Sequence, residues 1–156
     1  MADYEQRDYF TTDRRIAPPG DARWWVERTG RRSYLGHNDR GATVLMADTD
    51  DEIEGAFTPG ELLKLALAGC AGMTIDRVAA RRLGDDFPAT IVVESTSHDT
   101  DDRYTGFTEH VIVDAAQLDQ PTRATLASIV DRAIATGCTV GLTLTNGATV
   151  DVRLET

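Results

Sequence analysis

Apolar and branched side chains predict strands in two parts of the chain. In residues 22–37, ARWWVERTGRRSYLGH, aromatic and β-branched residues recur, turn chemistry follows at residues 38–41, and GATVLMAD then returns as a second strand. We therefore expect an N-terminal β-hairpin. Residues 89–98 and 104–115 show the same strand-like pattern on either side of the polar link DTDDR, which predicts two more strands.

The clearest helix signal begins at Thr58. This residue suits the N-cap, Pro59 suits the first helical turn, and Glu61 stands where the carboxylate of a capping box reaches back to the N-cap amide. Gly84 is a natural C-terminal stop. Residues 62–75 are apolar on nearly every side, so this helix is expected to be covered all round, which requires another helix or another subunit.

A second helix is predicted to open at Pro121 and to end at Gly137. Its apolar residues fall on one face, at the spacing of an amphipathic helix: Leu126, Ile129, Val130, Ala133 and Ile134. Beyond it, Asn146-Gly147 is a local hairpin signal between two short apolar runs. The order ββ–α–ββ–α–β indicates an α+β fold rather than the strict alternation of a parallel α/β sheet.

Length and composition fit one domain. The chain has 156 residues, 41% of them hydrophobic, which is enough for a sizeable core. Residues 1–21 are charged, contain Pro18-Pro19-Gly20 and lack apolar periodicity, so we expect an N-terminal arm followed by a domain over residues 22–156.

Charge and hydropathy narrow the possible partners and the compartment. The net charge of −10 argues against nucleic acid and anionic lipid as partners. The N-terminus has no apolar core of a signal peptide, and the longest apolar run, residues 62–75, is shorter than the ~20 residues that cross a membrane. We therefore expect a cytoplasmic protein that does not bind a membrane.

Two cysteines are the candidates for chemistry. Cys70 lies in mid-helix among small residues, and Cys138 lies at the break after the second helix. In a reducing compartment such cysteines are buried bystanders, metal ligands or a redox pair. A metal site would add one of His37, His98 and His110, but no C-x-x-C or H-x-x-x-H spacing prearranges ligands, so we expect no metal and no cofactor.

Two segments resemble the OsmC/Ohr family of thiol peroxidases. The segment FTPGELLKLALAGCAGMT is similar to the family's central helix, in which P-x-E-L-L precedes the first cysteine, and CTVGLTL is similar to its second-cysteine segment. The resemblance covers most of the chain from about residue 22 onward. It implies an intertwined two-layer homodimer in which both cysteines meet at the bottom of an apolar pocket near the subunit interface.

The resemblance also implies a reaction in oxidative stress defence. Cys70, as thiolate, would attack an organic hydroperoxide, or hydrogen peroxide, and become a sulfenic acid, which Cys138 would condense to a disulfide. A dithiol reductant, in the best-known branch a lipoylated protein, would restore the thiols. The activating cation of that branch comes from the N-terminal hairpin, and Arg28 is the best positional match, with Arg31 and Arg32 as alternatives.

The sequence departs from the hydroperoxide-reductase branch at two positions. Gly60 stands where that branch has a glutamate, and Glu61 is predicted to be a helix cap, because at ~100° per residue its side chain and that of Cys70 lie on opposite helix faces. Thr139 stands where several relatives have proline. A non-catalytic small-molecule or acyl-chain binding protein with vestigial cysteines is therefore the alternative function.

The resemblance and the local signals disagree about the tail. The resemblance implies a short helical turn from Cys138 to about Leu144 and one terminal strand from Thr149, whereas Asn146-Gly147 favours a hairpin. We favour the resemblance, because the family packs the second cysteine under the central helix.

Overall fold

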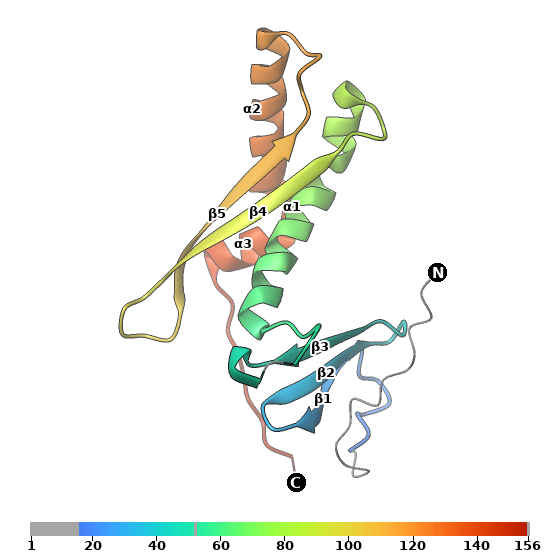
Figure 1. Cartoon of the computed structure of the whole chain (residues 1–156), viewed down its shortest axis with the longest axis vertical. Helices are drawn as coiled ribbons and strands as arrows, with labels where there is room; N and C mark the ends of the chain where they lie inside the picture. The colour runs from blue at the N-terminus through green and yellow to red at the C-terminus, as the bar shows by residue number, and fades with distance from the viewer. Residues whose placement is uncertain (1–15, 52, 156) are drawn as a thin grey trace. The chain divides into compact units, whose positions relative to one another are not determined.

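The computed structural model describes residues 16–51 and 53–155, so the predicted N-terminal arm lies outside the described residues apart from residues 16–21. The chain divides into two compact units, Met1–Leu62 and Leu63–Thr156. Each unit is described by itself. The elements are three short strands, a long helix, a β-hairpin and two further helices, so the predicted α+β class is confirmed (Figure 1).

The first unit contains an antiparallel sheet in the order β1 (Trp24–Gly30), β2 (Ser33–Asn38) and β3 (Thr43–Ala47). The prediction of a single strand over residues 22–37 was wrong, because the chain turns at residues 31 and 32 and divides this segment into two strands. Arg32 adopts a positive φ of 50° in this turn. An arginine in that conformation is uncommon, so the sequence held no turn signal there.

A short 3-10 helix (Thr49–Asp51) precedes the long helix α1 (Pro59–Leu83). The Thr58 amide donates to Glu61 Oε2 over 2.7 Å, and the Glu61 amide donates to Thr58 Oγ1 over 3.2 Å. The predicted capping box is therefore confirmed. At the other end Gly84 takes a positive φ of 93°, and its amide donates to the Ala80 carbonyl, so the predicted stop is confirmed as well.

The second unit packs a β-hairpin against helices. Strands β4 (Ala89–Ser97) and β5 (Tyr104–Val113) pair antiparallel, and α2 (Gln120–Gly137) and α3 (Thr139–Asn146) follow (Figure 1). A core cluster joins α1 to α2, with partly buried residues of β5 packed on it. Its buried members are Ile75, Leu126 and Val130, and Val111 and Val113 pack against them.

Only one face of α1 is buried in the described part of the chain. Its buried residues, Leu67, Ala71, Ile75 and Ala79, recur every fourth position and form a single stripe. By contrast, Met73 is 79% exposed and Leu65 is 50% exposed. The expected cover on every side is therefore not provided by residues 16–51 and 53–155.

The tail is helical where the resemblance predicted a helix. α3 follows Cys138 directly, the Leu142 amide donates to the Cys138 carbonyl over 2.8 Å, and no hairpin forms around Asn146-Gly147. The expected terminal strand from Thr149 was wrong for the single chain, because residues 147–155 are assigned to no strand. A strand needs a partner edge for its amides and carbonyls, and within the described residues none pairs with this segment.

Candidate functional site

In the second unit, α1 packs closely against two neighbouring elements near Cys70. A Cβ at Gly72 would lie 3.0 Å from Ile91 Cδ1, so this glycine lets β4 come near α1 just after Cys70. A Cβ at Gly137 would lie 3.1 Å from Thr74 Cγ2, so the end of α2 meets α1 one turn after Cys70. The next residue along the chain is Cys138, and both cysteines are free thiols within hydrogen-bonding reach of each other.

The surroundings of Cys70 favour its thiolate. A backbone hydrogen bond from Val140 is the largest influence that lowers the pKa of Cys70, and burial works against it. The Cys138 thiol and the Thr139 amide add hydrogen bonds that lower this pKa further. These amides belong to the first turn of α3, where unpaired N–H groups and the positive end of the helix dipole stabilise an anion.

Cys138 is the N-cap of α3 and is fully buried. The Gly141 amide donates to its sulfur over 3.3 Å, so the thiol takes the part that a serine or aspartate usually plays at a helix start. Burial raises the pKa of Cys138, and the neighbouring Cys70 and Glu109 raise it further. The two thiols are therefore unequal: Cys70 ionises more readily than usual and Cys138 less readily.

A cavity of about 490 Å³ lies beside the dithiol. Leu67 and Gly141, which lie beside Cys138, form part of its wall, and β5 and the end of α3 supply the rest: Tyr104, Thr105, Gly106, Phe107, Glu109, Leu144 and Thr145. Glu109 was not among the residues predicted from the sequence. The alternation in β5 could have identified it, because Glu109 occupies an inward-facing position of the strand, as do Phe107, Val111 and Val113.

The three candidate arginines lie in the first unit. Arg28 is exposed on β1 and pairs in register with Tyr34. Arg32 donates to Asp48 Oδ2 from Nε over 2.7 Å. Glu61 caps α1, as predicted. The pairing of an arginine with Cys70 therefore stays a prediction.

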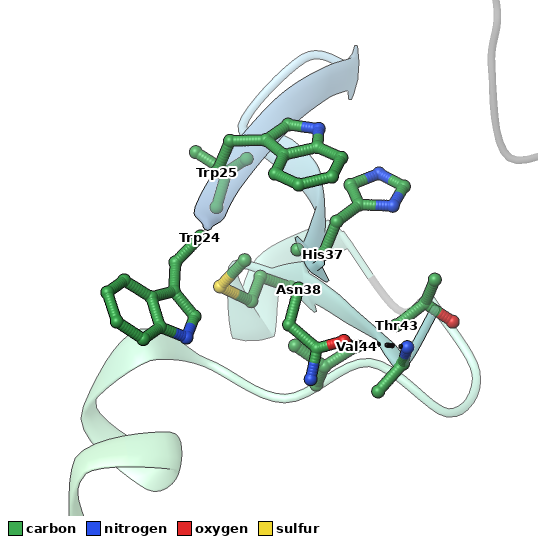
Figure 2. Close-up of a pocket in the computed structure, with 10 residues that line it drawn as sticks. Trp24, Trp25, His37, Asn38, Thr43 and Val44 are labelled. Atoms are coloured by element: carbon green, nitrogen blue, oxygen red, sulfur yellow. Dashed lines mark hydrogen bonds between the residues drawn. The ribbon is translucent and has the colours of Figure 1, made fainter. Parts of the chain in front are cut away.

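A groove of about 550 Å³ on the first unit's sheet contains none of the predicted catalytic residues (Figure 2). The Trp25 indole stacks on the His37 ring with centroids 5.1 Å apart. His37 Nε2 lies 3.0 Å from Glu27 Oε2, close enough for an ion pair but without hydrogen-bond alignment. His37 is thus engaged with residues of its own sheet.

Over residues 16–51 and 53–155, no group of three or more His, Cys, Asp or Glu side chains is placed to hold a metal ion. None of the helices in that part of the chain combines the length and hydropathy needed to cross a membrane.

The fold and the paired thiols define the class as an α+β protein with a dithiol centre at a helix N-terminus. The family model described as OsmC-like protein matches residues 49–153. An uncharacterized protein of Mycobacterium tuberculosis is 44% identical over 130 residues, which are 83% of this chain and 93% of that protein. The chain belongs to the OsmC-like protein family, and the predicted family membership is confirmed.

Solved structures share the fold. A Psychrobacter arcticus protein, provisionally described as an osmotic stress induced and detoxification response protein, matches with a TM-score of 0.59 and 21% identity, over 82% of this chain and 91% of that one. The organic hydroperoxide resistance protein OhrB of Bacillus subtilis matches with a TM-score of 0.51 and 20% identity, over 77% and 89%. At these identities the likeness concerns the fold alone.

Proposed function

We propose that this protein is a thiol peroxidase that reduces organic hydroperoxides in oxidative stress defence. The observation that carries the proposal is the placement of two free cysteines: Cys138 is the buried N-cap of α3, and the first-turn amides of that helix lower the pKa of Cys70 on α1. A peroxidase of this kind needs a nucleophilic thiolate and a second thiol that can form a disulfide with it. Membership of the OsmC-like family supports the same reaction class.

In the proposed reaction Cys70 is the nucleophile. Its thiolate attacks the distal peroxide oxygen, so an S–O bond forms, the O–O bond breaks and the alkoxide leaves as an alcohol after taking a proton. Cys138 then displaces the hydroxyl of the Cys70 sulfenic acid, which leaves as water with the proton of the Cys138 thiol. A dithiol reductant, for which a lipoylated protein is our candidate, returns the disulfide to two thiols and is itself oxidised.

We also propose that Arg28 supplies a cation to the Cys70 thiolate. Its side chain is exposed and forms no ion pair within residues 16–51 and 53–155, whereas the alternative Arg32 is bonded to Asp48. A guanidinium beside a thiolate favours the charged form and so adds to the effect of the α3 amides.

The proposed assembly is a homodimer in the cytoplasm. Exposed apolar side chains on α1 and on the tail are the support for a second subunit, notably Leu65, Met73, Val150, Val152 and Leu154. A reducing compartment suits a protein whose cysteines must return to thiols after each turnover.

Intact-mass measurement after one equivalent of tert-butyl hydroperoxide tests the function. We expect the wild type to lose two hydrogens as the disulfide forms, and Cys138→Ser to gain one oxygen as the sulfenic acid persists. Cys70→Ser should show no change, because a serine hydroxyl is not ionised near neutral pH. Unchanged masses in all three proteins would contradict the peroxidase and favour the non-catalytic binding protein with vestigial cysteines.

A further inference from the structure

Glu109 is a carboxyl group placed among apolar residues next to the dithiol. It follows the inward-facing parity of β5, and its Oε1 is buried without a hydrogen-bond partner in the described part of the chain. A carboxylate left in that position loses the solvation it would have in water, so the site favours the protonated acid. Burial accordingly raises the pKa of Glu109.

Glu109 is also within electrostatic reach of both thiols. It raises the pKa of Cys70 and of Cys138 through its charge, and it lines the cavity together with Gly141, whose amide bonds Cys138. An ionised glutamate at this position would disfavour the Cys70 thiolate, because two negative charges close together repel each other. A protonated Glu109 removes that opposition and brings a transferable proton into the same cavity.

Within the described residues, neither nearby cation pairs with this carboxyl. On the α2 side Glu109 borders a second hollow, where Arg123 and Asp131 are the charged members. The Arg123 guanidinium donates to the carbonyls of Leu118 and Ala116, each over 2.8 Å. Lys64 of α1 lies over the Tyr104 ring at 5.0 Å. Neither cation satisfies Glu109 Oε1.

We infer that Glu109 is the proton donor to the oxygen that leaves when Cys70 attacks a hydroperoxide, an inference that rests on the proposed peroxidase function. The Cys70 thiolate, the hydroperoxide and the Glu109 acid become a sulfenic acid, an alcohol and the Glu109 carboxylate. The negative charge thus moves from sulfur to Glu109, and no free alkoxide has to be released. Solvent returns the proton to Glu109 when the disulfide is reduced.

Three reagents separate proton donation from other roles of Glu109. With tert-butyl hydroperoxide, whose alkoxide needs a proton, Glu109→Gln should slow the oxidation of Cys70 by roughly 100-fold or more. With peroxyacetic acid, which releases a stable carboxylate, the variant should react as fast as the wild type. With iodoacetamide, which reports the thiolate alone, the variant should react as fast as the wild type, because a neutral amide replaces a neutral acid.

Matched variants complete the experiment. Glu109→Asp keeps an acid and should recover part of the tert-butyl hydroperoxide rate. Glu94→Gln removes an exposed carboxylate from the outward face of β4, beside His110, and should leave all three rates unchanged.

Two results would overturn the inference while the peroxidase stands: a Glu109→Gln variant as fast as the wild type with tert-butyl hydroperoxide, or one slowed equally with all three reagents. A wild type that reacts with iodoacetamide but with neither peroxide would instead overturn the proposed function, and the inference with it.

Discussion

At the scale of single residues, two chemically identical side chains acquire opposite properties within one site. Backbone amides in the first turn of α3 lower the pKa of Cys70 through hydrogen bonds. The Cys138 sulfur is buried at the N-cap of the same helix and accepts a hydrogen bond from the Gly141 amide, and burial raises its pKa. The environment, rather than the thiol itself, assigns the proposed nucleophile and the proposed resolving group.

The lowered pKa of Cys70 predicts a measurable pH dependence. Only the thiolate is alkylated, so Cys70 should react with iodoacetamide at pH values below the ordinary thiol pKa of ~8.5, and before Cys138. If Arg28 supplies the proposed cation, Arg28→Gln removes a charge that favours the thiolate and moves the profile to higher pH. Mass spectrometry of the alkylated cysteines across a pH series measures both effects.

Arg32→Gln is the control for that series, because Arg32 is bonded to Asp48. It should leave the Cys70 profile in place. If the pH profile of Cys70 moved in Arg32→Gln but stayed fixed in Arg28→Gln, Arg32 rather than Arg28 would supply the cation.

At the scale of elements, the ends of the helices determine the surroundings of the two cysteines. The first turn of α3 presents amides to Cys70 because Cys138 begins that helix directly after α2 ends at Gly137. α1 carries Cys70 and starts at a capping box whose two hydrogen bonds hold Thr58 and Glu61 together. Glu61 therefore serves as a cap at the helix start, as the sequence predicted.

Removing the cap of α1 should lower stability by a predictable amount. Thr58→Ala deletes the hydroxyl that accepts from the Glu61 amide, so the free energy of unfolding should fall by about 1 kcal/mol. Urea denaturation measures the change. Thr58→Ser keeps a hydroxyl and should stay close to the wild type, and an equally stable Thr58→Ala would show that the box contributes little.

At the scale of the whole molecule, apolar surface remains uncovered in the described chain. Met73 is exposed on α1, a helix with apolar residues on nearly every side. The tail exposes Val150, Val152 and Leu154, which alternate as they would in a strand. Exposed apolar surface of this kind is typical of an interface, and alternating residues suit a strand that pairs with an edge. The proposed homodimer accounts for both.

A single charge on α1 tests the proposed dimer. Met73→Glu would place an unpaired carboxylate in an apolar interface, which costs several kcal/mol, so sedimentation should show the variant as a monomer and the wild type as a dimer. Arg81→Glu changes an exposed charge in the last turn of the same helix and should remain a dimer. A wild type that sediments as a monomer at micromolar concentration would contradict the proposed homodimer.

The sequence by itself determined the elements whose signals are local. The capping box, the stop at Gly84, the strands β4 and β5 and the amphipathic α2 all follow from short patterns, because caps, alternation and helical periodicity act between neighbours in the chain. The two cysteines were also evident, together with the family they resemble.

Tertiary structure decided the rest. The turn at Arg32 has no local signal, the helix after Cys138 overrides the hairpin tendency of Asn146-Gly147, and the segment from Thr149 forms no strand without a partner edge. The inequality of the thiols and the position of Glu109 depend on α1, α3 and β5 meeting in space. A pKa responds to burial and to atoms a few ångströms away, and those neighbours are set by packing between elements distant in sequence.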